Sequence, residues 1–176
     1  MRFVFRTDAS AKMGSGHVMR CLTLAEELKK NGSDITFISR THEGNLNGLI
    51  SKQDINLVEL SEPEVFGPAS KKTEDDNYKE WLGVSQEQDA DETIRLLGQV
   101  KPDWLIVDHY GLDKVWEKTV SPHVGNIMVI DDLANRLHDC DMLLDQNWFE
   151  NMDTRYDGLV PANCTQLLGS EYALLR

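Results

Sequence analysis

The chain has 176 residues, and its 30 acidic against 18 basic side chains give a formal net charge of −12 at pH 7. This length is that of one domain large enough to bury its own core. The acidity argues against a nucleic-acid partner, which needs a basic face, and against an anionic membrane surface. No apolar run is long enough to span a bilayer, and Arg2 and Arg6 interrupt the early apolar stretch that a signal peptide would need. We therefore expect a cytoplasmic protein that acts on a small molecule.

Predicted strands and helices alternate along the chain. Apolar runs predict strands at 2–7, 34–39, 55–60, 103–107, 126–130 and 141–145, and helical spacing predicts helices at 17–30, 43–53, 88–99 and 112–120. The runs at 105–107 and 127–130 are continuously apolar, which is typical of strands covered on both faces. The pattern predicts an α/β domain with a doubly wound, mostly parallel sheet, that is, a Rossmann-like fold.

A glycine-rich turn joins the first predicted strand to the first predicted helix. It reads Met13-Gly14-Ser15-Gly16-His17-Val18-Met19-Arg20. Such a turn aims unpaired backbone N–H groups at a ligand, and a dinucleotide-binding turn would follow the pattern G-x-G-x-x-G. Here Met19 stands where the third glycine would be, and the titratable His17 follows Gly16 directly. We interpret the turn as a site of chemistry; the alternative is a polar surface histidine after a flexible turn.

His17 and Arg20 are three residues apart, so we expect them on one edge of the helix, beside its buried stripe. That edge faces the carboxyl ends of the strands, where open α/β sheets bind their ligands. A helix N-terminus disfavours the imidazolium form of histidine. We therefore predict a neutral His17 that can accept a proton near pH 7.

Acidic residues follow three of the predicted strands. Asp8 follows the first strand, Asp108 the fourth and the pair Asp131-Asp132 the fifth, with Tyr110 close behind Asp108. Parallel strands end at one edge of the sheet, so we expect Asp8, His17, Tyr110 and Asp131 to line one cleft. Capping of the helices that follow would explain Asp108 and Asp131 equally well.

These residues favour one kind of chemistry. They contain no serine–histidine–acid signature and no helical histidine pair for a metal, but they offer a base, an arginine, a phenol and several carboxylates. Such a set suits the displacement of a good leaving group by water, for which one base supplies about 10²–10⁴ in rate. The three cysteines (Cys21, Cys140 and Cys164) have neither the number of a disulfide framework nor the spacing of a zinc site.

Two stretches are less regular. Residues 61–86 are polar and charged, and they are too long for a plain connection, although 81–84 are apolar and expected to dock back on the domain. Residues 148–176 show weak periodicity and end on an apolar tail. We interpret 1–147 as one domain and 148–176 as a segment that crosses toward another.

The motifs together resemble a known family. Asp8 and the run Gly14-Ser15-Gly16-His17-Val18-Met19-Arg20-Cys21-Leu22 are similar to the N-terminal signature of the UDP-2,4-diacetamido-2,4,6-trideoxy-β-L-altropyranose hydrolases of pseudaminic acid biosynthesis. Further blocks match in order at 81–84, 107–110, 129–134, 143–147 and 167–176. The resemblance covers essentially the whole chain.

The resemblance implies a two-domain, glycosyltransferase-like (GT-B) architecture, in which 1–147 face the sugar and a second domain holds most of the UDP contacts. It implies that His17 activates water for attack on the anomeric carbon, with release of UDP, and that Tyr110 contacts the substrate. No metal or cofactor is implied. With the turn and the strand ends, the candidate substrate-binding residues are Asp8, Gly14, Ser15, Gly16, Arg20, Asp108, Tyr110, Asp131 and Asn147.

Two other functions stay open. A UDP-sugar-dependent glycosyltransferase of the same fold would also place a glycine-rich turn and a histidine here, because a fold does not fix a function. A nucleotide-binding domain without chemistry of its own is the other alternative. The missing third glycine and the presence of His17 argue against it.

Overall fold

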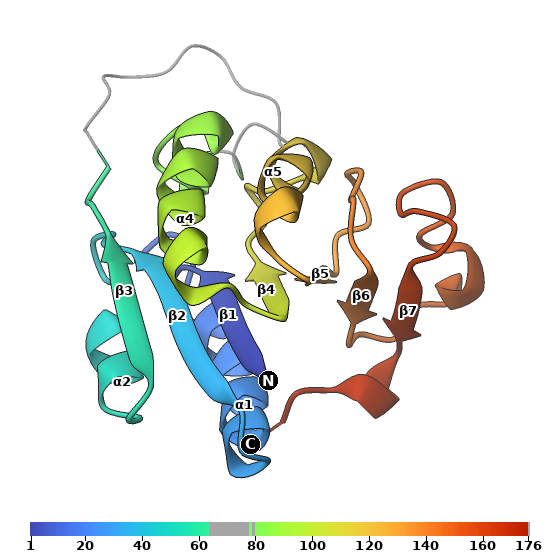
Figure 1. The fold of residues 1–176 in the computed structure, drawn as a ribbon. Helices are drawn as coiled ribbons and strands as arrows, with labels where there is room; N and C mark the ends of the chain where they lie inside the picture. The colour runs from blue at the N-terminus through green and yellow to red at the C-terminus, as the bar shows by residue number, and fades with distance from the viewer. Residues whose placement is uncertain (64–77, 79, 176) are drawn as a thin grey trace.

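The chain folds around one parallel sheet. The structure, a computed structural model, describes residues 1–63, 78 and 80–175. Seven strands lie in the order β3-β2-β1-β4-β5-β6-β7, and every neighbouring pair is parallel (Figure 1). This confirms the predicted doubly wound, Rossmann-like class.

The elements keep close to their predicted places. The strands are β1 (Arg2–Thr7), β2 (Asp34–Arg40), β3 (Asn56–Leu60), β4 (Trp104–Asp108), β5 (Asn126–Ile130), β6 (Met142–Asp145) and β7 (Thr165–Leu168). The helices are α1 (Gly16–Lys30), α2 (Asn47–Ser51), α4 (Gln86–Val100) and α5 (Lys114–Val120), with 3-10 turns at η1 (Ser121–His123), η2 (Met152–Thr154) and η3 (Ser170–Tyr172).

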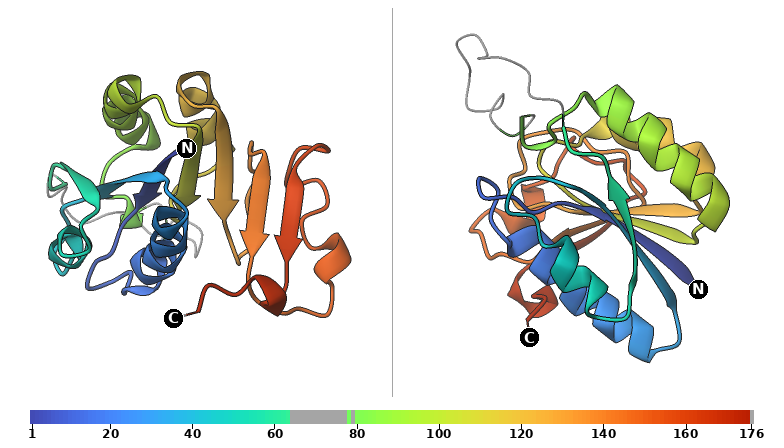
Figure 2. Two further views of the ribbon diagram at one scale, coloured as in Figure 1. Left: turned by 60° about the horizontal axis from the view of Figure 1, so that its bottom comes forward. Right: turned by 90° about the vertical axis from the view of Figure 1, so that its left-hand side faces the viewer.

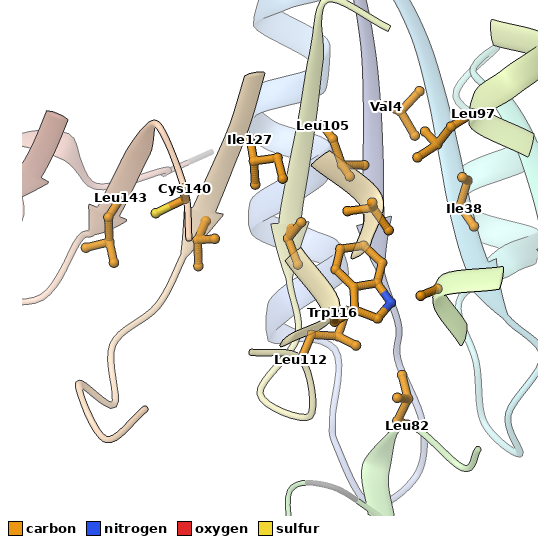
Figure 3. Packing of buried hydrophobic residues seen from close by; sticks show 14 of the residues in the cluster. Val4, Ile38, Leu82, Leu97, Leu105, Leu112, Trp116, Ile127, Cys140 and Leu143 are labelled. Carbon is orange, nitrogen blue, oxygen red and sulfur yellow. The ribbon is translucent and has the colours of Figure 1, made fainter. Parts of the chain in front are cut away.

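Each face of the sheet has its own core, because successive side chains of a strand point to opposite faces. Val4 and Leu105 pack with α4 and α5, around the fully buried Trp116 (Figure 3). Phe5 and Ile106 pack on the other face with α1 and α2. Figure 2 shows the sheet edge-on between these two helical layers. Burial on both faces explains the continuously apolar strands.

The strand order places a crevice beside β1. From β1 the chain continues through α1 to β2 on one side, and β4 lies on the other side. The connections that leave β1 and β4 therefore run to opposite faces, and ligands bind at such a switch point, outside the carboxyl ends of the strands. The first turn of α1 and the loop after β4 both lie there.

The helix predicted at 43–53 is much shorter. Only Asn47–Ser51 are helical, because Gly44 adopts a φ of +76° and the peptide of Glu43 accepts a hydrogen bond from the amide of Ala11 at 2.9 Å. A side chain at Gly44 would come within 2.9 Å of the Ala11 nitrogen. The preceding residues are thus held as a turn against the glycine-rich loop.

The sheet also extends beyond the predicted boundary at 147. Residues 165–168 form β7, which pairs with β6 and was not predicted as a strand. Thr165 and Gln166 are exposed and Leu167 and Leu168 are partly buried, so the apolar pattern of this strand is weak. Residues 148–164 thus connect two strands of the same sheet, and a second domain stays a prediction.

The stretch 61–86 is described only in part, and its acidic run at 74–76 lies outside the described residues. Leu82 is buried in the core beside α4 and α5, which confirms that 81–84 dock on the domain. None of the helices in the described ranges has the length and apolarity to span a bilayer.

Candidate active site

A cleft of about 580 Å³ opens at the carboxyl edge of the sheet. Its walls come from the first turns of α1, the turn at Trp81, the loops after β4, β5 and β6, and the end of the described chain. The lining residues are Met13, Gly16, His17, Met19, Arg20, Thr23, Trp81, Tyr110, Asp132, Gln146, Leu174 and Leu175.

The glycine-rich turn sets the position of His17. Gly14 adopts a φ of +79°, a conformation that favours glycine, and its amide donates to the Ser10 carbonyl at 2.8 Å. This closes the loop after β1 and starts α1 at Gly16. His17 then lies in the first helical turn, at the cleft. It is only 5 % exposed, so the expectation that it flanks the buried stripe is wrong.

His17 is paired with a buried carboxylate. Its Nδ1 lies 2.6 Å from Oδ1 of Asp108, the last residue of β4. A neutral imidazole that donates from Nδ1 to a carboxylate carries its lone pair on Nε2. Nε2 makes no hydrogen bond with the part of the chain that the structure describes. The pairing therefore leaves Nε2 as the basic nitrogen available to the cleft.

Arg20 fixes the other side of the same carboxylate. Its Nε donates to Oδ2 of Asp108 at 2.6 Å and its Nη2 donates to Oδ1 at 2.7 Å, a bidentate pair. Burial alone would raise the pKa of Asp108, but His17 and Arg20 outweigh it and hold this pKa well below its ordinary value. Asp108 is therefore ionised at neutral pH and can stabilise positive charge on His17.

A second carboxylate, Asp132, faces the cleft. Tyr110 donates its hydroxyl hydrogen to Oδ1, and Oδ2 accepts hydrogen bonds from Nη1 of Arg20 and Nδ2 of Asn147, both at 3.2 Å. Burial and the Asp132 carboxylate raise the pKa of Tyr110, so its phenol stays protonated. Arg20 thus links the two carboxylates of the site.

Aromatic rings cover one side of His17. The ring of Tyr110 meets the imidazole edge-on, with centroids 4.5 Å apart. Trp81 stacks against Tyr110 at 5.8 Å, and Tyr78 contacts both rings at 4.9 and 5.3 Å. The rings form an apolar wall next to the basic nitrogen.

Two predicted residues lie behind this cleft. Asp8 is fully buried, with an ion pair to Arg6 at 2.5 Å and a hydrogen bond from the Arg40 amide at 2.7 Å. Asp131 is also fully buried and pairs with Arg136 at 2.6 Å. Both carboxylates fix neighbouring backbone and arginine side chains, so the expectation that they line the cleft with His17 and Tyr110 is wrong.

The remaining predicted residues gather at the cleft or its rim. Gly16, Arg20 and Tyr110 line it, Asp108 lies directly beneath His17, and Asn147 reaches it through Asp132. Gly14 and Ser15 are exposed next to it, and Ser15 precedes α1 without a side-chain capping hydrogen bond.

Asp132, which belongs to the predicted acidic cluster, Gln146 and Trp81 line the cleft but were not predicted as site residues. The first two directly adjoin predicted residues, Asp131 and Asn147, so the motifs contained the signal but did not resolve it to a single position. Within the described ranges, no group of three or more histidine, cysteine, aspartate or glutamate side chains is arranged to hold a metal ion.

Comparison with solved structures establishes the class of fold. MurG from Acinetobacter baumannii matches with a TM-score of 0.56 at 12 % identity, over 95 % of this chain and 44 % of that one. The glycosyltransferase CalG4 matches at 0.49 and 18 % identity, over 74 % and 32 % of the two chains. The chain has the Rossmann-like α/β fold of one half of a GT-B glycosyltransferase.

Comparison of sequences identifies two relatives of the chain. No family model matches the chain. It is 30 % identical over all 176 residues to the UDP-2,4-diacetamido-2,4,6-trideoxy-β-L-altropyranose hydrolase of Campylobacter jejuni, of which it spans 52 %. It is also 26 % identical over 133 residues to an uncharacterized protein of Methanocaldococcus jannaschii, covering 75 % of this chain and 22 % of that protein. The chain therefore spans about half or less of these relatives. The first match confirms the resemblance inferred from the motifs.

Proposed function

We propose that the protein is a nucleotide-sugar hydrolase that cleaves UDP-2,4-diacetamido-2,4,6-trideoxy-β-L-altropyranose to UDP and the free sugar, as a step of pseudaminic acid biosynthesis. The observation that carries the proposal is the hydrogen bond between Nδ1 of His17 and Asp108, which leaves Nε2 free at the cleft. The 30 % identity to a hydrolase with this substrate supports it.

The reaction follows from this geometry. Nε2 of His17 takes a proton from a water molecule as the water oxygen attacks the anomeric carbon, and the bond from that carbon to the UDP oxygen breaks with its electron pair. UDP is a good leaving group and departs as an anion, so it needs no acid. Asp108 stabilises the imidazolium that forms, while the Nδ1 proton stays on the ring.

The other site residues position this base. Arg20 makes a bidentate contact with Asp108 and a further contact with Asp132, so it positions both carboxylates. It also lines the cleft, where its predicted contact with the substrate stays a prediction. The uncapped start of α1 at Gly16 offers backbone N–H groups to the diphosphate. The wall of Tyr110 and Trp81 limits the access of bulk water to His17.

A glycosyltransferase of the same fold is the competing function. Its support is the likeness of fold to MurG at 12 % identity, which carries no information on the reaction. The hydrolase is favoured because the sequence similarity extends over the whole chain.

Hydrolysis in H₂¹⁸O tests the proposal. The full-length protein is incubated with the UDP-sugar and no acceptor, and UDP and free sugar are analysed by mass spectrometry. Water attack at the anomeric carbon puts ¹⁸O into the sugar and none into UDP. Label in UDP would indicate attack at phosphorus instead. Turnover that requires an added sugar acceptor would support the glycosyltransferase.

A further inference from the structure

The cleft contains a carboxylate for which the hydrolytic step has no use. Asp132 follows β5 directly after the fully buried Asp131, yet its side chain is 16 % exposed and lines the cleft. Among residues 1–63, 78 and 80–175, no hydrogen bond or ion pair joins it to His17. It holds Arg20 and Tyr110, and it also presents an acceptor to the cleft that a ligand can use.

Asp132 is held rigidly. Its partners come from three separate parts of the fold, namely Tyr110 after β4, Arg20 on α1 and Asn147 after β6. A carboxylate offers about four lone-pair positions, and these donors occupy three of them. Among the described residues, one position therefore remains for a donor in the cleft, and its direction is fixed before a ligand binds.

The charge of Asp132 restricts what this ligand group is. A carboxylate repels the diphosphate of a nucleotide sugar and accepts hydrogen bonds from N–H or O–H groups. It therefore belongs to the part of the cleft that holds the sugar. Because its partner Tyr110 also borders His17, this part adjoins the reacting carbon.

The surface beside Asp132 is apolar. The ring of Tyr110, whose hydroxyl is bound to Asp132, stacks on Trp81. Met13 and Met19 add further apolar lining to the same cleft. Tyr110 thus places the acceptor oxygens of Asp132 beside the apolar rings of Tyr110 and Trp81. A ligand group that fits both features carries an N–H donor next to a small apolar group such as a methyl.

We propose that Asp132, Tyr110 and Trp81 form a subsite for an N-acylamino substituent of the sugar, an inference that rests on the proposed function. The amide N–H donates to Asp132, and the acyl methyl packs on the stacked rings of Tyr110 and Trp81. A hydroxyl at the same carbon can donate to Asp132, but it has no methyl group to cover the rings of Tyr110 and Trp81, which then stay in contact with water. The subsite therefore selects acylated amino sugars over their hydroxyl counterparts.

A matched pair of ligands tests the subsite. The first is UDP-2,4-diacetamido-2,4,6-trideoxy-β-L-altropyranose, and the second is its analogue with hydroxyl groups in place of both acetamido groups. Their Kd values are measured by calorimetry with the full-length protein carrying His17→Asn, so that neither sugar is hydrolysed during the titration. UDP alone is the reference, and kcat and KM are measured for both sugars with His17 in place. The variants are Asp132→Asn, Trp81→Ala and the control Asp157→Asn, an exposed carboxylate outside the cleft lining.

We expect the protein with an unaltered subsite to bind the diacetamido sugar at least about tenfold more tightly than the analogue. Asp132→Asn and Trp81→Ala should each reduce this preference to less than about threefold, while their Kd for UDP and the whole behaviour of Asp157→Asn stay unchanged. A protein with an unaltered subsite but no preference, or an Asp132→Asn variant that folds normally and keeps it, would overturn the subsite. Absence of hydrolysis with the preference intact would refute the proposed function alone, because the Kd values do not depend on turnover.

Discussion

His17 and Asp108 form a pair in which each fixes the state of the other. The carboxylate is ionised because His17 and Arg20 hold its pKa low despite burial, and in return it keeps the proton of His17 on Nδ1. The 2.6 Å contact thereby makes Nε2 the basic nitrogen. This pairing is the arrangement that the proposed base requires.

Asp108→Asn should lower kcat by about 10²–10⁴-fold with little change in KM, because an amide that donates to Nδ1 moves the ring proton to Nε2 and blocks the base. It should also cost stability, about 3 kcal/mol, since Arg20 loses its buried partner. Steady-state kinetics per folded protein and a urea titration measure the two effects. Asp103→Asn, at the opposite end of β4, is the matched control and should leave kcat unchanged; an Asp108→Asn enzyme of near-normal kcat would contradict the role of the pair.

The motifs predicted which strands supply the site but not which of two adjacent residues faces it. Beyond Ile130, where β5 ends, the alternation of a strand no longer applies. Asp131 turns inward because the Ala134 amide and Arg136 bind its carboxylate, and Asp132 is left for the cleft. Those partners are fixed by loop conformation, which the sequence pattern does not reveal.

The turn before α1 is the element that positions His17. Gly14 has a positive φ, and open space surrounds the position of a side chain there. A substitution would thus strain the backbone without a steric clash. Gly98 in α4 also has open space around it but carries ordinary helical backbone. An alanine at either position adds a methyl group in open space, but only the alanine at Gly14 has to adopt a positive φ. Comparing the two substitutions therefore separates backbone strain from the effect of the methyl group itself.

Gly14→Ala should destabilise the fold by about 1–2 kcal/mol, the cost of the left-handed conformation for alanine, and should lower kcat because His17 is displaced. Gly98→Ala should stabilise the fold by about 0.5–1 kcal/mol with unchanged kcat, because alanine favours the helix. Urea unfolding and steady-state kinetics compare the two. Equal effects of both substitutions on stability would disprove the strained turn.

Long elements with a clear apolar period were predicted within a residue or two, as α1 and β1 illustrate. The failures have physical causes. The helix predicted at 43–53 is shorter because the carbonyl of Glu43 accepts a hydrogen bond from the amide of Ala11, a residue distant in sequence. β7 is a short edge strand whose residues are exposed or partly buried, so its pairing with β6 rather than its own pattern defines it.

A buried ionic network joins the elements of one half of the domain. Arg6 on β1 and Arg40 on β2 both bind Asp89 on α4, at 2.6 and 2.8 Å, and Arg6 also binds Asp8. Burial would raise the pKa of both aspartates, but their partners hold both pKa values below the ordinary range. Arg6, with His109 and His42, does so for Asp8. Arg6 and Arg40 do so for Asp89. The two arginines and the two aspartates are fully buried, so removing one of them leaves its partner unpaired and lowers the free energy of unfolding.

These lowered pKa values predict acid unfolding. A carboxyl group whose pKa is lower in the folded state takes up its proton first in the unfolded state as the pH falls. Its stabilisation is complete above the unfolded pKa near 4 and is lost as the pH drops toward the folded value. Urea midpoints should therefore agree at pH 7 and pH 5 and fall steeply between pH 4 and pH 3. A midpoint that holds down to pH 3 would contradict the assigned ionisation of Asp8, Asp89 and Asp108.

The most direct test of the proposed hydrolysis is kcat for His17→Asn in the full-length protein. Asparagine can still donate a hydrogen bond to Asp108 in place of Nδ1, but it has no atom that acts as Nε2 does. We predict that kcat falls by about 10²–10⁴-fold while KM stays close to the wild-type value. The urea midpoint should fall moderately, because the buried ring gives up its contact with Tyr110. A well-folded His17→Asn protein that keeps more than about a tenth of the wild-type kcat would show that His17 is not the base.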